Sequence, residues 1–352
     1  MASDRGLCSI FAPSGKHGTW TTCRATSSSN GLDAVSRHRG RSEVSAFLHR
    51  RPRSARAGPA RVLPIVAAAL LIVPASVAGK SYDAWGAVVP EVGVNTAAAE
   101  GCPIESPDGL SLYIASNRAG GTATPDPNDI WVFHRESIDG PWGPAENLGQ
   151  PVNSTFADFC PTPLRGKALL FVSTRPGGCG TGTGDIYLGR NNPTHGWSIQ
   201  HLGCAADGSG PNFPGGEFGP SLVETAEGTF LFFSSDGFTP GGPQDIYMSR
   251  QLGDGSFAPA TAVTELNSGA SDFMPNVRKD GLEIVFNSNR AGGFGGQDVY
   301  TSTRASTADP WSAPVNLGPA INTAGNETRS SLSWDGARLH FGRDSEIYVS
   351  TR

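Results

Sequence analysis

Five acidic residues occupy the same place in a repeated pattern, each three positions before a Pro or Ser. They stand first in EGCP, DFCP, EFGP, DFMP and ETRS and are Glu100, Asp158, Glu217, Asp272 and Glu327. Carboxylates around one opening can hold a cation, an amine-rich ligand or a sugar, and Glu100, Asp158 and Glu217 could be acid, base and modulator in glycoside hydrolysis. Alternatively, each accepts hydrogen bonds from backbone amides of its own turn. The repetition favours this structural interpretation.

A second set of charged residues flanks a Gly-rich loop in each unit. The acids that follow the loop are Asp129, Asp185, Asp245, Asp298 and Glu346, and the arginines that precede it in four units are Arg118, Arg175, Arg290 and Arg343. We predict that each arginine pairs with the acid across its loop and fixes the loop by charge-assisted hydrogen bonds. Asp236 replaces the arginine in the third unit, so we expect a freer loop and look there first for a ligand site.

Four cysteines follow residue 78, and an even number in an exported chain suggests disulfide bonds. Cys179 and Cys204 lie in loops expected on one face, so we predict that they are bonded. A second bond, between Cys102 and Cys160 at equivalent positions of neighbouring inner strands, is the weaker prediction. Because no Cys-x-x-Cys pair or clustered His is present, we expect no metal, and we expect no cofactor.

These residues recur because the chain repeats. Trp85, Trp142, Trp197, Phe257 and Trp311 each open a unit of four short strands, with a hairpin turn such as SPDG or RKDG between two of them. Repeated four-stranded units are typical of the blades of a β-propeller. We therefore predict an all-β, five-bladed propeller of antiparallel blades over residues 83–352, in which the N-terminal strand completes the last blade. We expect the recurring tryptophans to pack between blades.

The last unit carries a family resemblance. Its WSAPVNLGPAINTAGNE, DG and EIYVSTR segments, from Trp311 to Arg352, resemble the TolB-type, WD40-like propeller repeat of bacterial envelope proteins. This resemblance extends over essentially all of residues 83–352. It implies a propeller fold and an extracytoplasmic protein-binding or scaffold role, and it carries no common catalytic residues. The unit that begins at Trp197 departs most from the pattern.

The N-terminal part has a different composition. Residues 1–61 are basic, and we predict a disordered leader; residues 62–78 are an apolar run that predicts a signal peptide cleaved after Ala78, with an uncleaved membrane anchor as the alternative. Residues 1–78 hold 11 of the 27 Lys and Arg but 3 of the 32 Asp and Glu, which leaves a net charge of −13 on the remainder. Such a charge repels nucleic acid.

Two function classes remain open. We predict a periplasmic or secreted monomer that binds an envelope or extracellular protein, or a polysaccharide, and that touches a membrane only through an uncleaved N-terminal segment. The alternative is a carbohydrate-active enzyme that uses the carboxylates at the channel mouth. A catalytic set is expected to break the repeat, whereas these acids follow it, so binding is the preferred hypothesis.

Overall fold

A computed structural model describes residues 82–122, 128–180 and 182–352. The predicted leader and signal or anchor segment lie outside these residues. Within them, no helix has the length and hydropathy needed to cross a bilayer. The description below therefore concerns the sheets that follow residue 81.

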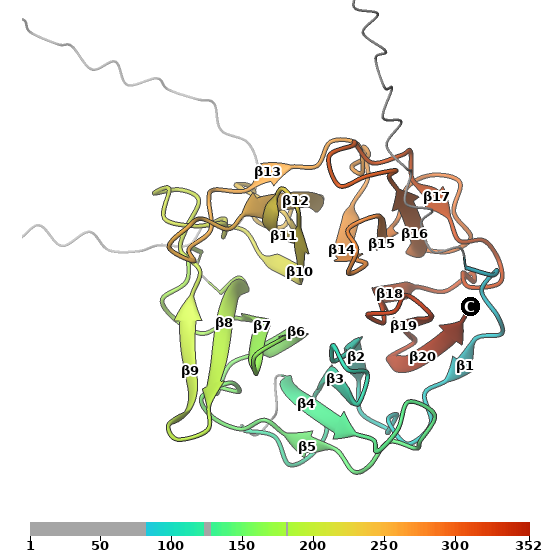
Figure 1. The fold of residues 1–352 in the computed structure, drawn as a ribbon, viewed down its shortest axis with the longest axis horizontal. Helices are drawn as coiled ribbons and strands as arrows, with labels where there is room; N and C mark the ends of the chain where they lie inside the picture. The colour runs from blue at the N-terminus through green and yellow to red at the C-terminus, as the bar shows by residue number, and fades with distance from the viewer. Residues whose placement is uncertain (1–81, 123–127, 181) are drawn as a thin grey trace, which may run out of the picture. The chain divides into compact units, whose positions relative to one another are not determined.

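Five four-stranded antiparallel sheets form the blades of a ring (Figure 1). Blade 1 contains β2 (Glu100–Glu105), β3 (Ser111–Ser116), β4 (Asp129–His134) and β5 (Glu146–Asn147). Blade 2 contains β6 (Asp158–Leu164), β7 (Ala168–Ser173), β8 (Asp185–Asn192) and β9 (Gly196–His201). Blade 3 contains β10 (Glu217–Thr225), β11 (Gly228–Ser235), β12 (Asp245–Arg250) and β13 (Thr261–Ala262).

Blade 4 contains β14 (Asp272–Val277), β15 (Glu283–Ser288), β16 (Asp298–Thr303) and β17 (Val315–Asn316). Blade 5 contains β18 (Glu327–Leu332), β19 (Arg338–Arg343) and β20 (Glu346–Thr351), and its fourth strand is β1 (Val89–Pro90) from the other end of the chain. Each predicted ring carboxylate is thus the first residue of an innermost strand. The predicted five-bladed propeller is confirmed.

The N-terminal strand closes the ring by backbone pairing. Val89 lies opposite Val349 and Pro90 opposite Tyr348. The amide of Gly86 also donates to the carbonyl of Thr351 at 2.8 Å. Closure in this way pairs an edge that would otherwise expose unpaired backbone groups.

Apolar strands and aromatic side chains hold neighbouring blades together. Every residue of β7 (ALLFVS) and β15 (EIVFNS) is buried, as expected for strands covered on both faces. Trp311 of blade 4 is 7% exposed and meets Phe232 of blade 3 edge-to-face, with ring centroids 6.3 Å apart. Trp142 lies in a buried cluster with Ile347 of blade 5. Both tryptophans therefore pack between blades, as predicted.

Each innermost strand carries a β-bulge near its middle. In blade 1 the pairing register with β3 shifts between Gly101 and Ile104, and the other four blades show the same irregularity. The residue two positions after the ring carboxylate has a positive φ in every blade, and these residues are Cys102, Cys160, Gly219, Met274 and Arg329. A bulge bends the strand and redirects the side chain at that point.

Candidate functional site

The ring carboxylates are buried and hydrogen-bonded within their own blades. Asp272 accepts hydrogen bonds from the amide and hydroxyl of Ser268, at 2.6 and 2.9 Å, and from Nη2 of Arg290 at 2.5 Å. Glu100, Asp158 and Glu327 have the same three kinds of donor, including a Thr or Ser four residues upstream. These four acids therefore stabilise the turn that leads into the innermost strand of their blade. Their role as a ligand-binding collar remains a prediction.

The arginines pair differently from the prediction. Their partners are the ring carboxylates, in the pairs Arg118–Glu100, Arg175–Asp158, Arg290–Asp272 and Arg343–Glu327. The expected pairs with Asp129, Asp185, Asp298 and Glu346 are not among the ion pairs of the described residues. Ser116, two residues before Arg118, lies opposite Glu100 on one side and Asp129 on the other, so the register leaves both acids within reach. The guanidinium reaches the side of the innermost strand, where its Nη2 also donates to the carbonyl of Val94 at 3.0 Å, while Oδ2 of Asp129 accepts from Thr122 and Asn147.

Three of the five acids that follow the Gly-rich loops bind loop amides. Oδ2 of Asp298 accepts from the amide of Phe294 at 2.6 Å, and Oδ2 of Asp185 accepts from that of Cys179 at 2.6 Å. Asp129 accepts in the same way from Thr122. Glu346 instead accepts a hydrogen bond from the Tyr348 hydroxyl at 3.0 Å. The loops are thus shaped by carboxylate-to-backbone bonds in place of the predicted arginine forks.

Glu217 of blade 3 is the ring carboxylate that lacks this set of donors. Phe213 replaces the upstream Ser or Thr and supplies only its amide, at 3.0 Å, while Ser235 donates its hydroxyl at 2.9 Å. Oε2 is buried without a hydrogen-bond partner. Burial, followed by the nearby charges of Asp185 and Asp236, raises the pKa of Glu217 well above its ordinary value. The surroundings of Glu217 therefore favour its protonated form.

Asp236 holds two loops of blade 3. Its carboxylate accepts hydrogen bonds from the amide of Gly216 at 2.6 Å and from the amide of Gly241. Asp236, which replaces the repeat arginine, therefore fixes the loop by accepting hydrogen bonds from backbone amides. The sequence had predicted a freer loop at this place. Glu217 consequently has two carboxylates, and no guanidinium, among the charges that act on it.

His201, at the junction of blades 2 and 3, is a residue that sequence reasoning missed. Its Nε2 lies 2.7 Å from Oδ2 of Asp185, and its Nδ1 accepts from the amide of Gly203 at 3.2 Å. Since Nδ1 is an acceptor, the ring proton is assigned to Nε2, which donates to Asp185. Asn147 and Asn316 bind the corresponding acids in blades 1 and 4. The sequence feature that could have revealed His201 is the tripeptide HLG at 201–203, because blades 1 and 4 have NLG at the equivalent positions.

The cysteines form one disulfide and one free pair. The predicted bond between Cys179 and Cys204 is present, with a Cα–Cα distance of 5.6 Å. Their sulfurs and a nitrogen of His201 lie within 4.8 Å of one another, but sulfurs joined in a disulfide offer no thiolate to a metal. Cys102 and Cys160 are unbonded, with their Sγ atoms 3.3 Å apart, so the weaker prediction of a second disulfide differs from the structure.

Cations and an indole gather on the opposite face of the ring, at the turns that follow the innermost strands. The Arg165 guanidinium and the Lys279 ammonium lie 4.8 and 4.4 Å from the ring centroid of Trp334. These three residues belong to blades 2, 4 and 5 and line a cavity of about 220 Å³ together with Arg190, Glu224 and apolar side chains such as Leu222. Burial, and secondarily the charge of Arg165, lower the pKa of Lys279. No ring carboxylate lines this cavity.

Comparisons with known proteins give resemblances of fold. No protein-family model matches the sequence, and no curated protein matches it. Among solved structures, TolB from Acinetobacter baumannii is 15% identical, with a TM-score of 0.39, and the match covers 72% of this chain and 55% of that one. The α-L-arabinofuranosidase from Lactobacillus brevis is 11% identical, with a TM-score of 0.49 and coverage of 72% and 90%.

A third structure, the catalytic domain of the Coprinopsis cinerea GH62 α-L-arabinofuranosidase, is 12% identical, with a TM-score of 0.49 and coverage of 76% and 96%. At these identities the similarity concerns the propeller fold, which hosts unrelated functions. The three comparisons assign no family to the chain. The choice between binding and catalysis therefore depends on the site itself.

Proposed function

We propose that this propeller is an exported binding module that engages an acidic segment of a partner protein through the face bearing Trp334. The observation that carries the proposal is the placement of Arg165 and Lys279 against Trp334 beside a cavity. In a chain whose residues beyond 78 carry a net charge of −13, cations held in one concave site favour a ligand of opposite charge. The carboxylate of Glu224 lies 3.9 Å from the Lys279 ammonium, but it is exposed to solvent, so an acidic group of a partner can replace it.

The size of the cavity favours a protein partner. Pockets for small organic ligands usually enclose about 300–1,000 Å³, whereas this cavity encloses about 220 Å³. It can accept one or two side chains of a larger partner that rests on the surrounding turns. Its apolar wall, with Leu164, Leu170, Leu188 and Leu222, would contact the non-polar part of such a segment. Sites on loops held by a rigid scaffold are common in recognition.

Export of the protein is part of this proposal. The Cys179–Cys204 bond supports it, because disulfides persist mainly in oxidising compartments. The predicted signal peptide gives a direct test, since the mature protein should begin at or near Gly79. N-terminal sequencing that finds an intact Met1 on protein from outside the cytoplasm would contradict the cleavage.

Binding is tested with the full chain and a fluorescent poly-L-glutamate peptide as probe. We expect saturable binding that weakens as salt is added. The double variant Arg165→Gln/Lys279→Gln should bind about 5- to 30-fold more weakly, because two partly exposed charge contacts are together worth roughly 1–2 kcal/mol. Lys167→Gln is the matched control, because it removes a charge from the same turn without lining the cavity. Equal affinity of the double variant and this control would refute the site.

The glycoside hydrolase alternative depends on Glu217. A carboxyl group with a raised pKa is suited to act as a general acid, which is the specific observation in its favour. Against it, Glu217 is 0% exposed, and Glu100 and Asp158 are occupied by arginine and turn donors. Incubation with arabinan and xylan tests this alternative. Reducing sugar released by the wild type and lost in Glu217→Gln would replace the binding proposal, and its absence would leave binding preferred.

A further inference from the structure

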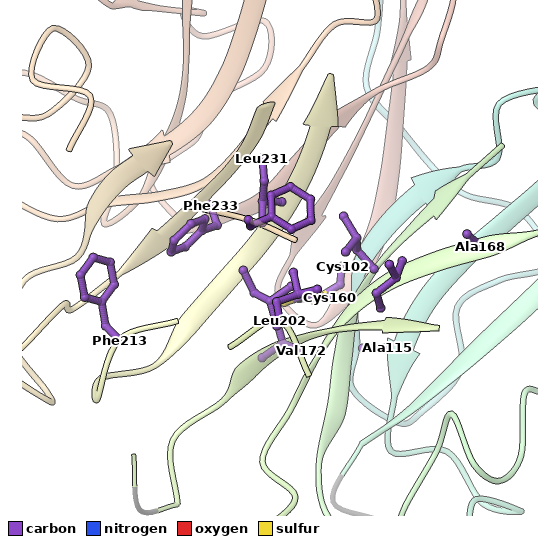
Figure 2. Close-up of a cluster of buried hydrophobic side chains, with 13 residues drawn as sticks. Cys102, Ala115, Cys160, Ala168, Val172, Leu202, Phe213, Leu231 and Phe233 are labelled. Atoms are coloured by element: carbon purple, nitrogen blue, oxygen red, sulfur yellow. Dashed lines mark hydrogen bonds between the residues drawn. The ribbon is translucent and has the colours of Figure 1, made fainter. Parts of the chain in front are cut away.

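One innermost strand brings a charged side chain into the part of the channel lined by Gly219, Met274 and Arg329, which we call the waist. These residues stand two positions after a ring carboxylate, at the bulge of their strand. The equivalent residues of blades 1 and 2 are Cys102 and Cys160, whose Sγ atoms lie 3.3 Å apart (Figure 2), and neither of them lines the cavity at the waist. Arg329 is therefore the one basic residue at this position of the repeat.

The guanidinium of Arg329 is buried without a counter-charge. The residue is 9% exposed, its Nη1 is a buried atom without a hydrogen-bond partner, and no ion pair found among the described residues includes it. A Cβ added at Gly219 would lie 3.0 Å from this Nη1, so the side chain of Arg329 reaches across the waist to blade 3. A buried cation without a nearby anion is costly, because nothing offsets its desolvation.

A cavity of about 20 Å³ lies beside this guanidinium. A water molecule needs at least about 10–15 Å³ of such volume, so the cavity holds one water molecule or one small ion. Of the described residues that line it, none is acidic, and besides Arg329 they include Asn276. Oδ1 of Asn276 accepts from the amide of Leu332 at 2.9 Å, which leaves its Nδ2 group as a second donor for an occupant. The cavity thus offers positive charge and hydrogen-bond donors to a single small ligand.

We propose that the waist binds one halide-sized monovalent anion, such as chloride, against the guanidinium of Arg329. One negative charge balances the one buried positive charge, and charge-assisted hydrogen bonds from Arg329, together with the amide of Asn276, would hold the ion. A divalent oxyanion such as sulfate is too large for a cavity of this volume, and its second charge would stay unbalanced. A cation is disfavoured, because it would lie beside a guanidinium in a cavity whose described lining contains no carboxylate.

A series of cavities connects the waist to the face that bears Trp334. A cavity of about 30 Å³ shares Ile104, Thr162 and Asn276 with the cavity at the waist. It also shares Lys279 and Trp334 with the cavity of about 220 Å³ on that face. An anion that enters from this face therefore passes the ammonium of Lys279, whose charge raises the local concentration of anions. The waist takes a free ion, so this inference does not depend on the protein partner proposed above.

Thermal unfolding of the full chain tests the site, with chloride replacing gluconate at constant ionic strength. Gluconate is a monovalent anion too large for the cavity, so the screening of charges is the same in every sample. Because chloride would bind the folded state alone, the ratio of folded to unfolded protein should rise about 11-fold at a chloride concentration about ten times the dissociation constant. For a domain of this size, the melting temperature should then rise by roughly 3–6 °C.

Arg329→Met removes the buried charge. Its melting temperature should not depend on chloride, and in gluconate alone it should equal or exceed that of the wild type, because an uncompensated buried charge is gone. Arg304→Met is the matched control and should respond to chloride like the wild type, because Arg304 lies over Trp311 at 4.2 Å and does not line the waist. Arg165→Gln/Lys279→Gln should also keep the response, which separates this site from the site proposed for an acidic peptide.

Two measurements on the wild type do not depend on the folding of any variant. The NMR line of chloride in solution should broaden when the protein is added and narrow again when bromide competes for the site. Crystals grown in bromide should show one anomalous peak at the waist, within hydrogen-bond distance of Nη1 of Arg329. A wild-type melting temperature that ignores chloride, equal responses of the wild type and Arg329→Met, or bromide crystals with no anomalous peak at the waist would overturn the proposal.

Discussion

Replacement of Arg290 by Met should destabilise the propeller strongly. Arg290 donates to Asp272 at 2.5 Å, to the carbonyl of Leu266 at 2.6 Å and to the Ser288 hydroxyl at 3.0 Å. The Asp272 side chain is 0% exposed and that of Arg290 is 17% exposed. Loss of one partner from such a buried pair leaves a carboxylate without its counter-charge, which costs about 3–5 kcal/mol. For a domain of this size the melting temperature should fall by roughly 6–20 °C.

Urea unfolding followed by tryptophan fluorescence measures this change. The midpoint should fall while the dependence of the unfolding free energy on urea stays the same. Asp272→Asn/Arg290→Met should recover at least about half of the loss, because no uncompensated charge remains. Arg250→Met, at an exposed arginine, should change the free energy of unfolding by no more than about 0.5 kcal/mol. A loss below about 1 kcal/mol in Arg290→Met would refute the reasoning.

Three further variants test other parts of the structure. Because the pKa of Glu217 is raised in the folded state, the wild type should lose stability as pH rises above 4.5. Glu217→Gln carries no such group, so its melting temperature should rise relative to that of the wild type over the same range. Parallel pH profiles of the two melting temperatures would contradict this. Trp311→Ala should lower the unfolding free energy by about 3–5 kcal/mol in urea titrations, and a loss under about 1 kcal/mol would argue against packing between blades. Cys179→Ser/Cys204→Ser opens a loop of 25 residues and should cost about 3.5 kcal/mol of unfolding free energy relative to the oxidised wild type, and the reduced wild type should match the variant.

The repeat made the fold predictable. Strand alternation, the turn signals and the position of each acid recur, so the number of blades and the first residue of each innermost strand follow from the sequence. Closure by Val89–Pro90 also followed, because a strand precedes the innermost strand of the first unit and the fifth unit supplies three strands of its blade. These are local signals, and every blade contains the same ones.

The partners of charged side chains were less predictable. Arg118 stands between two acids in the sequence, Glu100 and Asp129, and the alternatives are equally compatible with its spacing. Strand register leaves both within reach, because Ser116 lies opposite Glu100 and Asp129 alike, and the contacts of the folded chain decide: Arg118 also binds the carbonyl of Val94, while Asp129 accepts from a loop amide and from Asn147. His201 was overlooked because it occupies a position at which two other units have Asn, and its role depends on the distance to Asp185.

By itself, the sequence determined the repeat, the blades and the residues that break the pattern, because short-range hydrogen bonding and strand periodicity are written into each unit. Only the tertiary structure decided which groups from different blades meet. Arg165 and Lys279 both lie against Trp334, and Cys102 of blade 1 meets Cys160 of blade 2, because the ring brings distant units into contact. Such contacts depend on the curvature of the closed ring, which no single repeat encodes.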